Sequence, residues 1–247
     1  MRKYGLVGYP LSHSFSKRFF TELFSKNAIE AEYLNFEIPD LTALPSVIRE
    51  HPELVGFNVT IPHKGAVIPY LDHCDEKAAA IQAVNTVKIS RTDGKIELTG
   101  YNTDLIGFRD SLLPLLKPHH KKALVLGTGG ASKAVIAVLK ELSIQTQLVS
   151  REENSGTTIS YAQLNSDIME EYTIIVNTTP LGTYPKIDGF PEIPYNYLTN
   201  KHLLFDLVYN PAVTQFLQKG AEKGATIKNG LEMLELQAMA AWKIWEM

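Results

Sequence analysis

Two charged residues, Lys64 and Asp104, are the first candidates for chemistry in this 247-residue sequence. Lys64 follows an apolar β-type run in "FNVTIPHKG" (residues 57–65), just after Pro62. A lysine there is either a solvated loop residue or a proton carrier, because a positioned amine can exchange a proton with a reacting oxygen. Asp104 ends the stretch "GYNTD", and on spacing alone the two residues could equally form an ordinary ion pair between loops.

A glycine-rich turn is the second candidate site. In "LVLGTGGASKAV" it follows an apolar strand pattern and precedes a helical one. Glycine lets a backbone approach a phosphate, and the helix N-terminus offers unpaired N–H groups. The turn therefore predicts a dinucleotide site, although Ser132 departs from the third glycine or alanine of the fingerprint, and a βα turn without a ligand is the alternative. The residues expected at the pyrophosphate are Gly127, Thr128, Gly129, Gly130 and Ala131.

The end of the next predicted strand, "TQLVSR", indicates which dinucleotide is bound. Ser150 and Arg151 stand where NAD enzymes place an acidic residue for the ribose hydroxyls. A guanidinium can donate two parallel hydrogen bonds to a 2′-phosphate, which favours NADP. Glu152 and Glu153 follow at once and would repel that phosphate, so the strictness of the preference is left open.

Composition narrows the class of protein. With 45% hydrophobic residues, 21% charged residues and a net charge of −3, the chain is expected to be globular and not to bind nucleic acid. No apolar run is long enough for a membrane span, and the single cysteine, Cys74, is consistent with a cytoplasmic location. No metal site is predicted, because the adjacent His119 and His120, flanked by lysines, are interpreted as solvated.

The elements that must position these residues alternate between strand and helix patterns, which predicts an α/β fold. The first hundred residues contain a predicted helix over 14–26, strands before and after it, and a hairpin turn at Asp93-Gly94. A second block begins near Asp104 with a helix, the strand and glycine turn, and three more strands. A periodic helix follows Gly230.

Eight short motifs occur in a fixed order along nearly the whole chain. They are "GYPLSHSFS", "NVTIPHK", "AVNT", "GYNTD", "GTGGAS", "NTTPLG", "LVYNPAVTQFL" and "NGLEMLELQA". Together they resemble the shikimate dehydrogenase family (the shikimate/quinate dehydrogenases). The resemblance implies two α/β domains flanking a cleft: a substrate-binding catalytic domain, residues 1–101 plus 230–247, and a Rossmann-like NADP-binding domain, residues 102–229. It also implies that the C-terminal helix returns to complete the first domain.

The resemblance implies reversible, NADPH-dependent reduction of 3-dehydroshikimate to shikimate, a step of chorismate and aromatic amino-acid biosynthesis. Lys64 and Asp104 match the family's catalytic pair, and which of them moves the proton is left open. Substrate binding is expected at both of these residues and at Ser14, Ser16, Thr60, Asn85, Tyr209 and Gln237. Ordinary roles compete for some of them: helix capping for Ser14 and Ser16, a turn for Asn85.

Further cofactor contacts are expected from the resemblance at Thr179, Leu207 and Gly230, beside Ser150 and Arg151 at the adenosine ribose. Family members often have a threonine and a second basic residue after the arginine, whereas "SREENS" has neither. Two other functions therefore stay open: an NAD-using quinate or shikimate dehydrogenase, and a non-catalytic shikimate-binding relative. The protein is expected to be a monomer or a homodimer whose partner is a small-molecule substrate.

Overall fold

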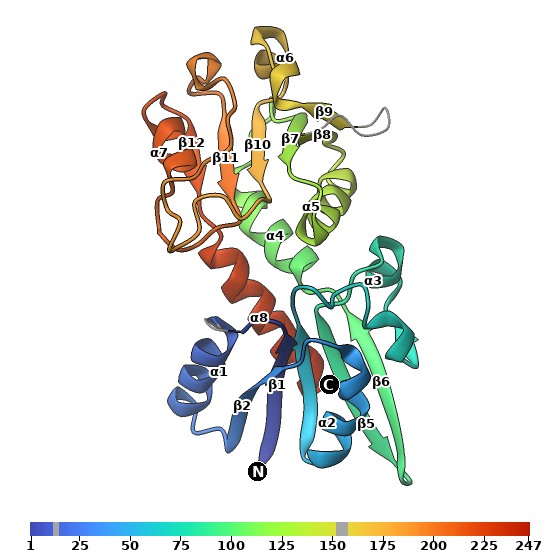
Figure 1. The fold of residues 1–247 in the computed structure, drawn as a ribbon. Coiled ribbons are helices and arrows are strands. Elements are labelled where there is room, and N and C mark those ends of the chain that lie inside the picture. Colours follow the sequence, from blue (N-terminus) through green and yellow to red (C-terminus); the bar gives the residue numbers. More distant parts are fainter. Residues whose placement is uncertain (12–14, 152–157) are drawn as a thin grey trace. The chain divides into compact units, whose positions relative to one another are not determined.

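A computed structural model describes residues 1–11, 15–151 and 158–247. The chain forms two compact units (Figure 1), Met1–Ile106 with Glu235–Met247, and Gly107–Leu234. The sequence interpretation placed the boundaries after residues 101 and 229, whereas the units change within two helices, α4 (Asp104–Leu112) and α8 (Leu231–Glu246).

The first unit contains a mixed six-stranded sheet in the order β2-β1-β3-β5-β6-β4. β1 pairs in parallel with β2 and β3, whereas β5 is antiparallel to both β3 and β6. The β5–β6 hairpin turns at Asp93 and Gly94, both at positive φ, which confirms the predicted turn. The strands are β1 (Arg2–Gly8), β2 (Ala31–Glu37), β3 (Leu54–Val59), β4 (His73–Cys74), β5 (Thr86–Thr92) and β6 (Lys95–Tyr101).

Both faces of this sheet carry apolar side chains that are covered by helices. One face packs against α2 through residues such as Leu44 and Ile48, and the other against α1 and α8 through Phe20 and Trp245. The helices and short 3-10 turns of this unit are α1 (Phe15–Lys26), η1 (Leu41–Ala43), α2 (Leu44–Glu50), η2 (Ile68–Tyr70) and α3 (Glu76–Ile81).

Helix α8 approaches the sheet closely at Trp245. The indole of Trp245 lies over Gly56 of β3, where an added Cβ would come within 2.3 Å of the ring. Its Nε1 donates a hydrogen bond to the Val87 carbonyl at 3.0 Å. The C-terminal helix therefore belongs to the core of the first unit through its last turns, although it begins in the second.

The second unit contains a parallel six-stranded sheet in the order β12-β11-β10-β7-β8-β9. Counted from β7, this is the doubly wound 3-2-1-4-5-6 order of Rossmann-like folds. The strands are β7 (Lys122–Leu126), β8 (Gln145–Ser150), β9 (Thr158–Ser160), β10 (Ile174–Asn177), β11 (Leu203–Asp206) and β12 (Thr226–Lys228). The two edge strands, β9 and β12, were not predicted because three residues are too few to show a period.

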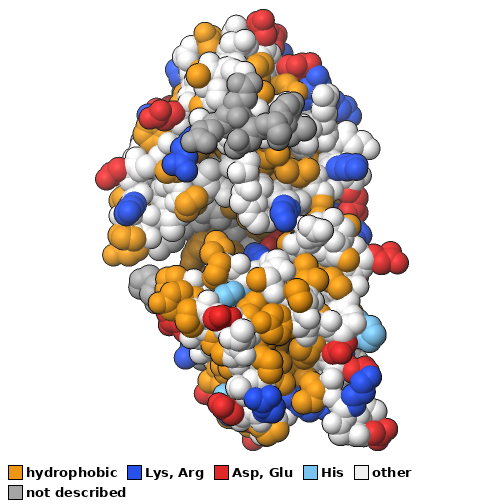
Figure 2. Space-filling model, turned by 45° about the vertical axis from the view of Figure 1, so that its right-hand side comes forward, with side chains coloured by type: hydrophobic (Ala, Val, Ile, Leu, Met, Phe, Trp, Pro, Cys, Tyr) orange, Lys and Arg blue, Asp and Glu red, His pale blue; other side chains and the backbone are white. Residues whose placement is uncertain are grey.

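The helices and 3-10 turns of the second unit are α4, η3 (Leu113–Leu115), α5 (Gly130–Glu141), η4 (Tyr161–Gln163), α6 (Ser166–Glu171), η5 (Tyr195–Tyr197), α7 (Gln215–Ala221) and the start of α8. None of the helices within the described ranges has the length and apolarity needed to cross a membrane. Basic and acidic side chains are interspersed on the face shown in Figure 2, without a continuous basic band over its described part.

The expectation that His119 and His120 are both solvated is wrong for His120, of which 4% is exposed. Its Nδ1 accepts a hydrogen bond from the Lys117 N–H at 3.0 Å, and its Nε2 lies 3.1 Å from the Lys201 carbonyl. The neighbouring lysines suggested a solvated ring, but the ring turns inward to satisfy backbone groups of the segments that precede β7 and β11.

Candidate functional site

The loop after β3 presents Lys64 at the carboxyl end of the parallel strands β1 and β3. The Lys64 carbonyl accepts a hydrogen bond from the Val84 N–H at 2.7 Å. On the other side, the buried ring of His63 lies 2.7 Å from the Ile38 carbonyl. The backbone on both sides of the side chain is thus anchored, so Lys64 is not a solvated lysine on a loose loop.

Lys64 and Asp104 meet although they are far apart in the chain. Lys64 Nζ donates to Asp104 Oδ2 at 2.7 Å, and the two side chains are 20% and 6% exposed. Asp104 is the first residue of α4, where the unpaired N–H groups and the helix dipole favour a carboxylate. The lysine is accessible enough to reach a ligand, while the carboxylate is held inside.

Asn85 completes this arrangement. Its Nδ2 donates to Asp104 Oδ1 at 2.9 Å and to Gln237 Oε1 at 3.2 Å. Its Oδ1 accepts from the Thr103 N–H at 2.7 Å, which fixes the orientation of the amide. Asn85 is 4% exposed, so it is a buried member of the polar cluster and not a simple turn residue.

The other predicted substrate residues of the first unit lie at the same end of the sheet as Lys64. Thr60 directly follows β3, and its side chain is half-buried. Ser16 is in the first turn of α1, and its hydroxyl hydrogen-bonds the buried Tyr33, whose pKa is raised by burial and lowered to a lesser extent by this contact. Ser14 lies outside the described residues.

Sequence reasoning missed three polar residues that support the cluster. Tyr33 donates its hydroxyl to Asn58 Oδ1 at 2.7 Å, and Asn58 Nδ2 donates to Thr86 Oγ1 at 3.1 Å. Thr86 in turn donates to Asn85 Oδ1 at 3.1 Å. Asn58 and Thr86 belong to the motifs "NVTIPHK" and "AVNT", so the motifs themselves carried the signal.

A groove of about 1160 Å³ in the second unit surrounds the glycine turn. Gly127 adopts a φ of 101°, and a Cβ there would come within 2.9 Å of Thr179 Cγ2, so only glycine fits. At Gly129 and Gly130 a Cβ would meet none of the described atoms within 4 Å, which leaves space for a phosphate above the start of α5. The residues present therefore fit a dinucleotide.

The groove brings together most of the predicted cofactor residues. Gly127, Thr128, Gly129, Ser150, Arg151 and Thr179 line it. Gly130 and Ala131 begin α5 and are not among its lining residues. The groove also has walls that the sequence did not predict. They come from the end of β9, from η4 and from the proline-rich segment after β10: Ser160, Tyr161, Ala162, Thr178, Pro180, Leu181, Phe190, Pro191 and Glu192.

Leu207 and Tyr209 follow β11 and Gly230 follows β12, and none of the three lines this groove. A Cβ on Gly230 would come within 2.2 Å of the Leu207 carbonyl, and the Gly230 N–H donates to the Val208 carbonyl at 3.1 Å. Tyr209 follows directly and is half-buried. Glycine is thus required at position 230 for packing, and the predicted ligand contacts of these residues stay predictions.

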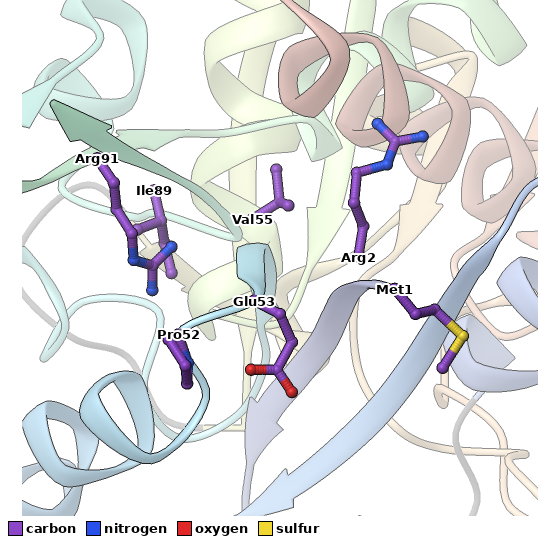
Figure 3. A pocket seen from close by; sticks show the side chains of 7 residues that line it. All are labelled: Met1, Arg2, Pro52, Glu53, Val55, Ile89 and Arg91. Atoms are coloured by element: carbon purple, nitrogen blue, oxygen red, sulfur yellow. The ribbon is translucent and has the colours of Figure 1, made fainter.

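A second hollow, of about 400 Å³, lies at the opposite end of the strands from Lys64 in the first unit. Figure 3 shows its lining side chains, among them Arg2, Glu53 and Arg91. Arg2 pairs with Glu246 at 2.6 Å, Glu53 pairs with Lys3, and Arg91 donates to the Leu54 carbonyl at 2.5 Å. The charges are already partnered within the protein, so we assign no ligand to this hollow.

Chemically, the cluster in the first unit can hold an ammonium beside a carboxylate and offer a proton to one ligand oxygen. The groove in the second unit can hold a dinucleotide with phosphate on its ribose. Within the described ranges, no three His, Cys, Asp or Glu side chains are grouped so that they could hold a metal ion. The residues of the two sites are, each within its own unit, of the kinds that a dinucleotide-dependent exchange of hydride and proton requires.

Curated proteins similar to this chain cover nearly all of it. Shikimate dehydrogenase (NADP(+)) from Caldicellulosiruptor saccharolyticus is 35% identical over 99% of this chain and 92% of its own length. This chain belongs to the shikimate dehydrogenase family. The family model "Shikimate dehydrogenase substrate binding domain" matches residues 6–87, within the first unit.

Solved structures of the shikimate dehydrogenase family have the same fold. The Thermus thermophilus enzyme, in complex with NADP(H) and shikimate, has a TM-score of 0.85, is 30% identical, and matches over 99% of this chain and 93% of its own. The Listeria monocytogenes enzyme, in complex with shikimate and NAD, has a TM-score of 0.86, is 27% identical, and matches over 100% of this chain and 92% of its own. The two α/β units with a Rossmann-like second domain are therefore those of the family.

Proposed function

We propose that this chain is an NADP-dependent oxidoreductase that reversibly reduces 3-dehydroshikimate to shikimate, a step of chorismate and aromatic amino-acid biosynthesis. The first unit binds the substrate and the second binds NADP. The observation that carries the proposal is the 2.7 Å contact between Lys64 Nζ and Asp104 Oδ2, with Asn85 on the other carboxylate oxygen. Membership of the family supports the reaction and the cofactor.

Bound NADPH supplies the hydride that reduces the carbonyl carbon. The protein must then deliver a proton to the carbonyl oxygen as negative charge develops there. Lys64, as an ammonium, gives that proton, becomes a neutral amine and is reprotonated from solvent. Asp104 accepts a hydrogen bond from the lysine and one from a substrate hydroxyl, which aligns the two reacting groups. In the oxidation direction the same steps run in reverse.

Binding of the substrate needs partners for a carboxylate and for several hydroxyls. We assign the carboxylate to Ser14, Ser16 and Tyr209, and the ring hydroxyls to Thr60, Asn85 and Gln237. The half-buried positions of Ser16, Thr60 and Gln237 leave these side chains within reach of a ligand, which supports this assignment. A polyol is distinguished from apolar molecules because each unpaired polar group in such a site costs binding free energy.

NADP would be held by the glycine turn and by Arg151. The backbone of residues 127–131 takes the pyrophosphate, and Ser150 and Arg151 take the adenosine ribose with its 2′-phosphate. Arg151 lines the groove, which supports this placement. Thr179, Leu207 and Gly230 are assigned to the ribose and nicotinamide end. A cytoplasmic location and a monomeric or homodimeric state stay predictions.

NAD is the second candidate cofactor, because a family member 27% identical to this chain is described in complex with shikimate and NAD. The absorbance of the reduced nicotinamide, followed with shikimate or quinate against NADP and NAD, tests both. We expect the highest kcat/KM with shikimate and NADP. Preference for NAD or quinate would reassign the specificity, and tight shikimate binding without turnover would indicate a non-catalytic relative.

A further inference from the structure

Two polar side chains are completely buried at the carboxyl ends of neighbouring strands in the second unit. Asn177 ends β10 and Asp206 ends β11, and the two residues are partners in the parallel register. Asn177 Nδ2 donates to Asp206 Oδ1 at 2.9 Å. Neither residue lines the groove, and neither has a role in the reaction described above.

The Asp206 carboxylate collects donors from two further segments. Its Oδ1 also accepts from the Val208 N–H at 3.1 Å, and its Oδ2 accepts from Thr214 Oγ1 at 2.5 Å. Burial raises the pKa of Asp206 to about 6, which the three hydrogen bonds only partly offset. Above that pH the carboxylate is ionised inside the protein, at a cost in free energy.

The other end of Asn177 reaches the wall of the groove. Its Oδ1 accepts from the Thr179 N–H at 3.0 Å and from Thr179 Oγ1 at 2.6 Å. Thr179 lines the groove, and its Cγ2 is the atom that a Cβ on Gly127 would meet. The amide of Asn177 thus holds the Thr179 turn, which packs against Gly127, and the Asp206 carboxylate in turn holds that amide.

The direction of these hydrogen bonds matters. An ionised carboxylate only accepts, so Asp206 requires the Nδ2 side of the Asn177 amide to face it. That leaves Oδ1 to face Thr179, which offers two donors. If the amide were reversed, its NH₂ group would face the two donors of Thr179, and its oxygen would face the Asp206 carboxylate. Neither pair could form a hydrogen bond, so the carboxylate selects one orientation of the amide and with it one conformation of the Thr179 turn.

We propose that Asp206 is a positioning residue for the dinucleotide: through the amide of Asn177 it holds the Thr179 turn against Gly127 in the conformation that accepts the cofactor. The inference rests on the proposed function, in which this groove binds NADP. The location agrees with the general place of ligands in open α/β sheets, outside the carboxyl ends of the strands.

Asn177→Asp gives a sharp test, because it replaces the donor to Asp206 by a second carboxylate. At pH 9 we expect both groups to be ionised, which removes the hydrogen bond. At pH 6 the pair shares a proton, since like charges raise one of the two pKa values, and the shared proton restores a donor. Burial raises the pKa of the nearby Tyr195, and the charge of Asp206 raises it further, so its hydroxyl stays protonated at both pH values.

The measurement is the Kd of NADPH, from the fluorescence of the bound nucleotide, divided by the Kd of the parent at the same pH. We expect Asn177→Asp to weaken binding about tenfold at pH 9 and less than about threefold at pH 6. Asn165→Asp is the matched control, because this exposed N-cap of α6 keeps its acceptor and gains the same charge in the same unit. It should leave the Kd unchanged.

A second variant separates positioning from stability. Asp206→Asn retains an acceptor for Asn177, and the Thr214 hydroxyl can turn to accept from the new amide, so the NADPH Kd should stay within about threefold of the parent. Asp206→Leu removes the acceptor and should weaken binding about tenfold. Thermal unfolding of each variant is recorded beside the Kd.

The inference is overturned if Asn177→Asp binds NADPH as tightly as the Asn165→Asp control at both pH values, whatever its thermal stability. A parent protein that binds no NADPH would instead remove the proposed function, and the inference with it. A loss at pH 9 that is not recovered at pH 6 would also contradict the inference, since it would reflect general damage to the unit.

Discussion

The side-chain amide of Asn85 donates to Asp104 Oδ1 at 2.9 Å, while Lys64 Nζ donates to the other oxygen, Oδ2, at 2.7 Å. Both carboxylate oxygens are therefore occupied by donors from different loops, and the carboxylate cannot rotate without losing one of them. The lysine is therefore held at its side-chain end by a restrained carboxylate as well as at its backbone by the bond to Val84.

Removal of the lysine amine should abolish most turnover. We expect Lys64→Ala to lower kcat about 10²-fold to 10⁴-fold with a small change in the KM of shikimate, because proton transfer occurs only in the transition state. Steady-state kinetics with NADP measure both constants. Lys140→Ala, on the exposed face of α5, is the control. Near-normal turnover of Lys64→Ala would remove this residue from the mechanism.

Loss of the Asn85 amide should loosen the carboxylate. We expect Asn85→Ala to lower kcat/KM for shikimate about tenfold to a hundredfold, since Asp104 Oδ1 loses a charge-assisted hydrogen bond in a buried place. Asn85→Asp should be worse at neutral pH, because it brings a second carboxylate against Asp104. Equal activity of all three proteins would show that the restraint on Asp104 has no effect on the reaction.

Arg151 should determine how strongly the enzyme prefers the phosphorylated dinucleotide. We expect Arg151→Ala to raise the KM of NADP about tenfold or more and to leave the KM of NAD nearly unchanged, because only NADP carries the 2′-phosphate. Kinetics with the two dinucleotides at low and high salt measure the ratio. If the ratio of kcat/KM values does not move, the phosphate is bound elsewhere.

Gly56 should be intolerant of any side chain. We expect Gly56→Ala to lower the free energy of unfolding by about 1–3 kcal/mol, because the new Cβ overlaps the Trp245 ring and displaces α8. Urea unfolding followed by tryptophan fluorescence measures the change. Gly65→Ala is the control, since its Cβ would meet nothing closer than 3.5 Å. Parent-like stability of Gly56→Ala would mean that α8 shifts without cost.

His120 should make stability depend on pH. Burial lowers its pKa from 6.5, so the folded protein binds the proton less well than the unfolded chain. The stability that the neutral His120 contributes to the folded protein is fully present above about pH 6.5. It is lost as the pH falls from there toward the lowered pKa. We expect His120→Gln to flatten the decline in unfolding free energy between pH 7.5 and pH 5.5, measured in urea. An identical decline in both proteins would exclude His120 as its source.

The local patterns were enough to predict the α/β class, the β5–β6 hairpin and the helix after Gly230. The glycine turn was readable because its conformation needs residues without a Cβ, which the sequence shows directly. The family could be recognised for a similar reason: its motifs are short continuous stretches, and most of them lie at or just after the end of a strand. Edge strands such as β9 were missed because their pairing, not their composition, makes them strands.

The sequence alone determined which residue types were available: an amine, a carboxylate, glycines before a helix and an arginine after the second strand. Only the tertiary structure decided that Lys64 and Asp104 meet, that Asn85 is buried between the carboxylate and Gln237, and that His120 turns inward. It alone joined Asn177 to Asp206. Contacts between residues far apart in the chain depend on how the strands are ordered in the sheet, and that order is set by the packing of the whole unit rather than by any local pattern.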